Sequence, residues 1–318
     1  SSPTTTVTTK TKTKTTQLAS SFVDSVEAYT IRVPRRKAAV DGTITDERLF
    51  NLSFRYVPRH TRKPPVVVLH GGPSLTSSYL YNLAELGFRS MFCYDQLGVG
   101  KSDEPAEDAF YSLDWAVQDL EYLIEAVLGR HEPYHLYAHA YGGALAYEFL
   151  KQGSSTSHYC RSVVMSSAPT DIPAVRATYE KLVQSLGPMQ FAAQHVCRIP
   201  APMLAAAYAY PGRVWTGMTH YAEYRAHQQS LSSSSSFLQS SDGDDKDDDK
   251  DSDDEIDLLS TPCLGLQGEF DFVNTSQWAY YFEQFQALQL PNCSHHGLYE
   301  NPGLYAETLR NFWSEYDV

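Results

Sequence analysis

Apolar and polar residues alternate along two early stretches of the chain, residues 27–34 and 48–57. A period of two is typical of strands that bury only one face. A turn-rich connection containing Asp41-Gly42 lies between the two stretches, so we predict an antiparallel ribbon at the edge of a sheet. The next apolar run, residues 66–69, is short and β-branched, which is typical of an inner strand covered on both faces.

Short apolar strands then alternate with segments of helical spacing. Strands are predicted at residues 66–69, 91–94, 162–165, 261–268 and 287–290, with a further buried strand beginning at His135. Helices are predicted at residues 76–87, 113–129, 142–150, 278–285 and 305–316. This alternation implies a parallel sheet with right-handed crossovers. We therefore predict an α/β fold with a mostly parallel central sheet flanked by helices.

The alternation stops after the sixth predicted strand. From residue 169 to about residue 230 the pattern predicts only helices, at 174–186, 189–196 and 203–209. The insertion is rich in aromatic residues: Tyr208, Tyr210, Trp215, Tyr221 and Tyr224. Its position between strands favours a helical cap over an active site. For any single aromatic residue, a place in the insertion's own core is an equally open interpretation.

Two segments of biased composition separate the folded parts. Residues 1–24 are rich in Thr, Ser and Lys, and residues 231–257 combine a serine tract with an acidic tract; we predict both to be disordered. The core is then divided into residues 25–168 and 258–318, with the cap at 169–230. Residues 242–257 carry a charge of −9 out of the net −13, so the acidity says little about the substrate.

Composition excludes several functional classes. The sequence has no run of eighteen apolar residues that would cross a membrane and no basic face for nucleic acid. The five cysteines are scattered without C-x-x-C spacing, which favours free thiols in a reducing compartment and indicates neither a metal site nor a cofactor. We expect a cytoplasmic protein, or an organellar one if the N-terminal segment is the remnant of a transit peptide. The oligomeric state is not indicated.

The most informative stretch is residues 135–148. Ala138-His-Ala-Tyr-Gly-Gly143 has the outline of G-x-S-x-G, the sharp strand-to-helix turn that displays the nucleophile of α/β-hydrolases. Ala138 replaces the first glycine, a mild change. Ala140 stands at the nucleophile position, where a methyl group cannot attack a carbonyl carbon. We expect the glycines at 142 and 143 to let the helix begin close to the sheet.

An acid and a histidine follow in the order that an α/β-hydrolase triad requires. Asp271 comes three residues after Gly268, at the end of a predicted strand. His295 is the candidate base, and spacing alone leaves His296 equally open. For the oxyanion hole we expect one backbone N–H from Tyr141 and one from the His70-Gly71-Gly72 loop, where we favour Gly72 over Gly71.

Three motifs together resemble the proline iminopeptidase family of serine hydrolases. They are His70-Gly-Gly-Pro-Ser74, Tyr94-Asp-Gln-Leu-Gly-Val-Gly-Lys-Ser102 and His139-Ala-Tyr-Gly-Gly143, against the family's HGGPG, YDQRGxGxS and GxSxGG. Gly268-Glu-Phe-Asp271 and Ser294-His295, ahead of Glu300-Asn-Pro302, resemble its acid and histidine loops. The resemblance favours His295 over His296, and it covers roughly residues 25–230 and 258–316.

The resemblance also implies a substrate class. The insertion is similar to that of the amino-acid amidase and tricorn-interacting-factor branch, in which Glu223 takes the place of an acid that holds the substrate's free α-amino group. A carboxylate in a dry cap pairs well with an ammonium. We also expect Gly71, Trp215 and Tyr224 to line the substrate site. The implied substrate is a small molecule or a short peptide.

Several departures from the family pattern affect that substrate class. HGGPS replaces HGGPG, and Leu97 replaces the usual arginine. Phe272 follows Asp271, where several members of the family have a second amine-binding glutamate. These changes leave open a more apolar amide or ester as substrate, and specificity for proline is not implied.

Ala140 has three interpretations. It is an engineered Ser-to-Ala change, the mark of a natural pseudoenzyme or ligand-binding relative, or a sign that another residue attacks. The third has little support, because no other nucleophile occupies the turn. The intact partners Asp271, His295 and Glu223 favour the engineered change, since a protein inactive for long would be expected to lose them.

Overall fold

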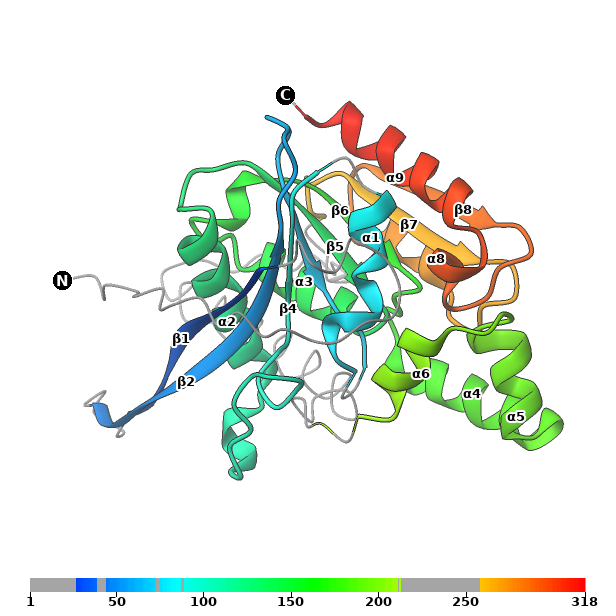
Figure 1. Cartoon of the computed structure of the whole chain (residues 1–318), viewed down its shortest axis with the longest axis horizontal. Helices are drawn as coiled ribbons and strands as arrows, with labels where there is room; N and C mark the ends of the chain where they lie inside the picture. Colours follow the sequence, from blue (N-terminus) through cyan, green and yellow to red (C-terminus); the bar gives the residue numbers. More distant parts are fainter. Residues whose placement is uncertain are drawn as a thin grey trace, which may run out of the picture.

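The computed structural model describes residues 27–38, 44–72, 75–86, 89–210, 212 and 258–317. Within these ranges eight strands form one sheet in the order β1-β2-β4-β3-β5-β6-β7-β8 (Figure 1). The strands are β1 (Glu27–Ala38), β2 (Ile44–Val57), β3 (Val66–Leu69), β4 (Met91–Tyr94), β5 (Tyr134–His139), β6 (Cys160–Ser166), β7 (Cys263–Gly268) and β8 (Phe285–Leu290). The predicted disordered segments, 1–24 and 231–257, lie outside the described residues.

The sheet is parallel except at one edge. β1 and β2 form an antiparallel ribbon, and β2 joins the sheet antiparallel to β4. The pairs from β4 through β8 are parallel. The predicted edge ribbon and mostly parallel sheet are confirmed.

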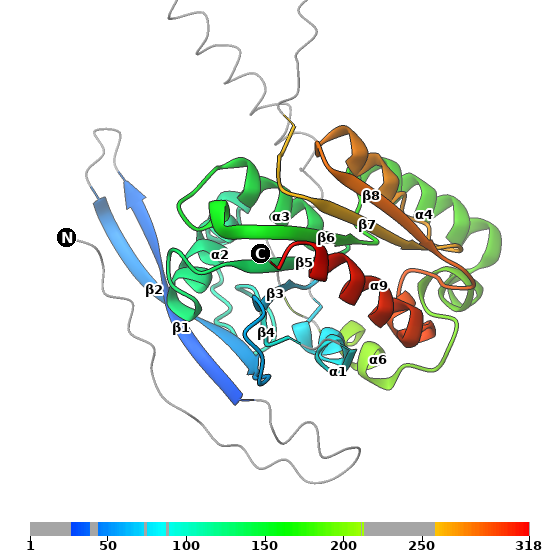
Figure 2. The same cartoon turned by 90° about the horizontal axis from the view of Figure 1, so that it is seen from above.

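Helices cover both faces of the sheet. They are α1 (Asn82–Leu86), α2 (Leu113–Val127), α3 (Gly142–Lys151), α4 (Ile172–Leu186), α5 (Pro188–Phe191), α6 (Pro202–Tyr208), α8 (Gly297–Glu300) and α9 (Pro302–Glu315). In Figure 2, α2 and α3 lie on one side of the sheet and α1 and α9 on the other. Alternate residues of β3 explain the two cores: Val67 and Leu69 pack with α2 and α3, whereas Val66 and Val68 pack with α1 and α9.

Two predicted helices differ in the structure. The helix expected at 76–87 is divided into a 3-10 turn, η2 (Ser77–Leu80), and the short α1. The helix expected at 278–285 is wrong: a 3-10 turn, η6 (Thr275–Tyr280), comes first, and residue 285 already begins β8. Aromatic residues at 278, 281, 282 and 285 imitate a helical period. In the structure Trp278, Tyr281 and Phe282 pack around Tyr147 of α3 instead, so tertiary packing overrides the local pattern.

The predicted helices after β6 are present as far as the structure describes them. α4 and α5 lead into a π-helical turn, η5 (Ala192–Val196), and α6 follows. These helices lie together at one end of the molecule (Figure 1). No strand occurs within residues 167–210. Among the described helices, none combines the length and the apolar character needed to cross a bilayer.

A buried ion pair fastens the edge ribbon to the core. Arg35 of β1 donates from both terminal nitrogens to the carboxylate of Asp119 on α2, each at 2.7 Å. The side chains are only 1% and 4% exposed. Burial raises the pKa of Asp119, and the hydrogen bonds from Arg35 oppose that rise. The pair therefore links two elements that are far apart in the sequence.

Candidate active site

The turn after β5 has the geometry expected of a nucleophile elbow. Ala140 has a φ of 50°, a left-handed conformation that costs a non-glycine residue of order 1–3 kcal/mol and is typical of functional sites. Its N–H donates to the Ser166 carbonyl at 2.9 Å. The turn therefore keeps its shape although residue 140 carries no hydroxyl group.

Two glycines allow α3 to begin against the sheet, as expected. A Cβ on Gly142 would lie 2.8 Å from the carbonyl oxygens of both Leu69 and His70. A Cβ on Gly143 would lie 2.5 Å from that of Ala168. Both distances are shorter than packed atoms tolerate, so these positions accept only glycine in this arrangement.

The glycine loop after β3 lies directly against position 140. A Cβ built on Gly71 would lie 2.9 Å from the Cβ of Ala140. The N–H of Gly71 donates to the Tyr79 hydroxyl at 2.8 Å and is therefore already engaged. This bond supports the expectation that Gly72 supplies the oxyanion donor on this side. Residues 73 and 74 lie outside the described residues.

Gln96 joins the glycine loop to the elbow. Its amide oxygen accepts from the Tyr141 hydroxyl at 2.6 Å, and its backbone N–H donates to His70 Nε2 at 3.1 Å. Because Nε2 accepts, Nδ1 carries the proton and donates to the Gly71 carbonyl at 2.8 Å. Burial lowers the pKa of His70, which keeps this neutral form. Leu97, at the usual arginine position, is buried in the apolar core.

The structure brings His295, and not its neighbour, to the predicted acid. His295 Nδ1 lies 3.0 Å from Asp271 Oδ1, and the same oxygen accepts from the Val273 N–H at 3.1 Å. The Asp271 side chain is fully buried. His296 instead pairs through Nε2 with the Tyr208 hydroxyl at 2.9 Å. The bond to Asp271 leaves Nε2 of His295 as the nitrogen available for proton transfer.

The loop that carries both histidines is held by the insertion and by Glu300. The N–H groups of residues 295 and 296 donate to the carbonyls of His195 and Val196, each at 3.1 Å. Glu300 accepts from the Ser294 hydroxyl at 2.8 Å and from the backbone N–H of Arg198 at 2.6 Å. The segment after α5 therefore fixes the histidine loop over the ends of the strands.

Gly268 offers a test of this packing. A Cβ at this position would lie 2.4 Å from the carbonyl oxygens of Cys293 and Ser294, which are backbone atoms beside His295. We expect Gly268→Ala to lower the free energy of unfolding by about 1–3 kcal/mol, as overpacking does. Urea unfolding measures the change.

Gly303→Ala is the matched control, because an added Cβ there meets nothing within 4 Å. Residue 303 lies in α9, where alanine is favoured over glycine by about 0.5–1 kcal/mol. A Gly268→Ala protein as stable as the Gly303→Ala protein would refute the close contact.

Three histidines meet at the site, which the sequence analysis missed. The ligand atoms of His139, His295 and His296 all lie within 4.8 Å of one another, and all three residues are buried. Burial, reinforced by the neighbouring His295, lowers the pKa of His139 to about 3. Burial also lowers the pKa of His296. The signal for His139 was its place next to Ala140 in the elbow, and the signal for His296 was its place next to the candidate base.

Of the predicted substrate contacts, the structure describes Gly71 but none of the three in the cap. Glu223, Trp215 and Tyr224 lie outside the described residues.

An aromatic wall lies beside the candidate base. The ring of Phe272 packs on that of His295, with centroids 4.9 Å apart. Phe191 of α5 lies 5.3 Å from Phe272 and extends this aromatic wall. An apolar surface therefore adjoins the candidate base.

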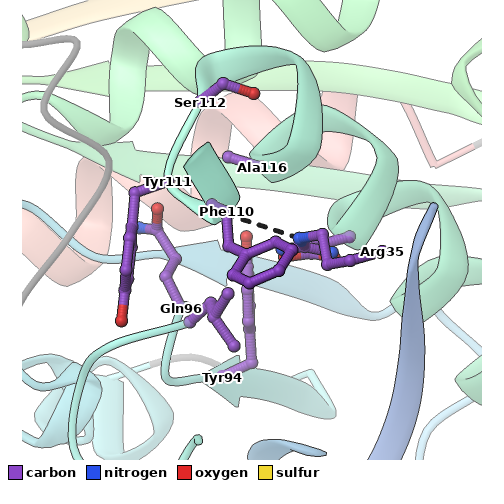
Figure 3. Close-up of a pocket in the computed structure, with 9 residues that line it drawn as sticks. Arg35, Tyr94, Gln96, Phe110, Tyr111, Ser112 and Ala116 are labelled. Carbon is purple, nitrogen blue, oxygen red and sulfur yellow. Dashed lines mark hydrogen bonds and ion pairs between the residues drawn. The ribbon is translucent and has the colours of Figure 1, made fainter. Parts of the chain in front are cut away.

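A small cavity, which Gln96 also lines, lies between β1, α2 and the loop after β4. It has a volume of about 10 Å³, which is enough for roughly one water molecule. Figure 3 shows Arg35, Tyr94, Gln96 and Phe110 around it. The buried Tyr94 hydroxyl has no hydrogen-bond partner among the described residues. The cavity suits an internal water and is too small for a substrate.

Residues 66–308 match the alpha/beta hydrolase family. The chain belongs to that family. The solved structure of a proline iminopeptidase from Mycobacterium smegmatis superposes with a TM-score of 0.64 at 18% identity, covering 90% of this chain and 99% of that chain. At this identity the likeness supports the alpha/beta hydrolase fold alone. The predicted fold class is thus confirmed.

Among the curated relatives are several proteins named proline iminopeptidase. The protein of Thermoplasma volcanium is 24% identical over 294 residues, covering 86% of this chain and 96% of the relative. The protein of Saccharolobus solfataricus is 31% identical over 145 residues, covering 44% of this chain and 45% of the relative. These similarities agree with the resemblance seen in the motifs, at low identity.

Proposed function

We propose that this alpha/beta hydrolase site belongs to a serine hydrolase that acts through an acyl-enzyme, and that the chain with Ala140 is its inactive form. The contact of His295 Nδ1 with Asp271 Oδ1, 3.0 Å long, carries the proposal. It supplies an oriented imidazole on the loop that meets the elbow. The Ser167 hydroxyl and His139 Nε2 both bond the His295 carbonyl, at 3.0 and 3.2 Å, which holds that loop to the strand ends.

The proposed chemistry needs a serine at position 140. Its hydroxyl attacks the substrate carbonyl carbon while His295 Nε2 takes the proton, and Asp271 stabilises the imidazolium. The N–H groups of Tyr141 and Gly72 donate hydrogen bonds to the carbonyl oxygen as negative charge develops on it. His295 then gives its proton to the leaving amine, the C–N bond breaks, and a water activated by the same nitrogen hydrolyses the acyl-enzyme.

For the substrate we propose N-terminal aminoacyl peptides or amino-acid amides. The support is the likeness to proteins named proline iminopeptidase and the carboxylate of Glu223 in the insertion. Glu223 is proposed to bind the free α-amino group, and Trp215 and Tyr224 to line the site with it. A charge-assisted hydrogen bond of this kind contributes about 1.5–3 kcal/mol.

One observation favours a second candidate. Phe272 stands against His295, where an amine-binding glutamate would serve the first candidate better. Together with Phe191 and Tyr179, whose ring lies 5.0 Å from that of Phe191, it forms an apolar wall. This wall suits an esterase or amidase for apolar substrates that lack a free amine.

A substrate panel on Ala140→Ser separates the two candidates. The panel pairs aminoacyl p-nitroanilides having a free amine with their N-acetylated counterparts, and adds short acyl esters. We expect the free-amine substrates to have the higher kcat/KM by about 10–100-fold, in line with one charge-assisted hydrogen bond. Higher kcat/KM for N-acetylated substrates or acyl esters would contradict the first candidate and favour the second.

Glu223→Gln in the same background tests the proposed amine contact. We expect the preference for a free amine to disappear, because the amide carries no charge to pair with the ammonium. Glu180→Gln is the matched control, since Glu180 on α4 has a side chain that is 69% exposed. A preference unchanged by Glu223→Gln would refute the assignment.

A further inference from the structure

We propose that His139, His295 and His296 bind one divalent transition-metal ion of the Zn²⁺ class. One ligand atom from each lies within 4.8 Å of the other two, and all three residues are buried. His139 comes from the end of β5 and the other two from the loop after β8, so the fold brings these nitrogens together. This inference does not depend on the proposed hydrolase activity, because it concerns the chain with Ala140 as it stands.

His295 is already arranged as a metal ligand. Its Nδ1 is bonded to Asp271, which leaves the Nε2 lone pair for the ion. Ligating histidines in proteins usually donate their other ring nitrogen to a carboxylate or carbonyl, which fixes the tautomer and raises the basicity of the ligand. Asp271 gives His295 such a partner, and Oδ2 of the same carboxylate has no hydrogen-bond partner among the described residues.

His296 has a comparable outer partner. Its Nε2 lies 2.9 Å from the Tyr208 hydroxyl of α6, so Nδ1 is the nitrogen left for the ion while that contact is kept. The rings of His296 and His139 stack at 4.9 Å with an interplanar angle of 22°. Burial lowers the pKa of both imidazoles, and the neutral form is the one that ligates.

His139 must exchange its present hydrogen bonds before it can bind the ion. Its Nε2 lies 3.2 Å from the His295 carbonyl, which only accepts, so Nε2 now carries the proton and Nδ1 accepts from Tyr79 at 2.9 Å. On metal binding the proton moves from Nε2 to Nδ1, with no net gain or loss. Nδ1 then donates to the Tyr79 oxygen, and Nε2 binds the ion.

The ligand set indicates the class of ion. Three neutral imidazoles suit Zn²⁺, Co²⁺, Ni²⁺ or Cu²⁺, whereas Mg²⁺ and Ca²⁺ prefer oxygen ligands. Zn–N bonds of about 2.0–2.1 Å in a tetrahedron place the nitrogens about 3.3 Å apart, so the side chains close inward from their present separation. Three ligands leave a fourth position for water. The ion would occupy Nε2 of His295 and block the base of the proposed hydrolase.

The test is a titration of the full, metal-free chain, made without an affinity tag, with Zn²⁺ followed by calorimetry and with Co²⁺ followed by visible absorption. Residues 242–257 contain eleven carboxylates, so both titrations are run in excess Mg²⁺, which competes for oxygen ligands but not for imidazole. We expect one ion per chain and the intense absorption of tetrahedral Co²⁺.

Single variants assign the ligands. We expect the affinity for the ion to fall at least about tenfold in each of His139→Gln, His295→Gln and His296→Gln. Removing only an outer hydrogen-bond partner of a metal ligand already causes a loss of that size. His131→Gln is the matched control at an exposed histidine and is expected to leave binding unchanged. Thermal melting identifies any variant that fails to fold. If His296→Gln does not fold, Tyr208→Phe, which removes only the outer hydroxyl that contacts His296, is measured in its place and is expected to weaken binding. Tyr79→Phe and Asp271→Asn serve His139 and His295 in the same way.

Two results would overturn the proposal. One is the absence of stoichiometric binding to the parent chain in Mg²⁺. The other is binding that every folded variant retains at the parent affinity. Neither result bears on hydrolysis by Ala140→Ser, so failure of the metal site and failure of the proposed function are separable.

Discussion

Ala140→Ser is expected to raise kcat/KM for an activated aminoacyl amide at least about 10⁴-fold over the chain with Ala140, because loss of a triad nucleophile costs roughly 10⁶ in kcat. The elbow keeps a φ of 50° at residue 140, and His295 is bonded to Asp271. Release of p-nitroaniline measures the gain.

Two controls test whether the gain in kcat/KM depends on the nucleophile position of the elbow. Ala138→Ser places a hydroxyl two residues earlier, on β5, and is expected to leave the rate at background. Adding Asp271→Asn to Ala140→Ser is expected to reduce kcat about 10⁴-fold, because the imidazole then adopts the wrong tautomer. A folded Ala140→Ser protein that stays at background would favour a natural ligand-binding relative over an inactive hydrolase.

Asp119→Ala is expected to lower the free energy of unfolding by about 3–5 kcal/mol, since it leaves a buried charge without its partner. Arg35 has a side chain that is only 1% exposed and loses two hydrogen bonds of 2.7 Å. The lost contact also joins β1 to α2, so the edge ribbon is expected to open first. Urea unfolding gives the free energy, and hydrogen exchange locates the opening.

An exposed ion pair between β1 and β2 is the matched control. Arg36 and Glu47 lie 3.2 Å apart with side chains 40% and 45% exposed, and Glu47→Ala is expected to cost at most about 1 kcal/mol. If Asp119→Ala cost no more than Glu47→Ala, the buried pair would not fasten the ribbon. Replacing both Arg35 and Asp119 by apolar residues of similar size is expected to recover much of the loss.

Much of the fold follows from local patterns in the sequence. Alternation in β1 and β2 fixes which face of the ribbon is buried. The apolar run of β3 has no such period, and its short length and β-branched residues are what favour an inner strand over a helix. The failure at 278–285 arose where the aromatic spacing fits a helix but Tyr147 of α3 takes up those rings. Long-range packing of this kind leaves no local signal.

Part of the candidate site was likewise predictable from the sequence, and part was not. The order of positions 140, 271 and 295 was sufficient to expect the contact between Asp271 and His295, because parallel strands bring their carboxyl ends to one edge. Spacing alone left His295 and His296 open, and only the family resemblance favoured His295. In the structure His295 contacts Asp271, whereas His296 contacts Tyr208. The convergence of His139 with both depends on the path of a loop after β8, which no periodicity encodes.

Covalent labelling tests the central claim most directly. Ala140→Ser and the parent chain are treated with a fluorophosphonate probe, and intact mass and peptide mapping locate the adduct. We expect one adduct per chain in Ala140→Ser, on the side chain at position 140, with none in the parent and a strongly reduced rate when His295→Gln is added. A folded Ala140→Ser protein that forms no adduct, or forms one elsewhere, would contradict the assignment of this site.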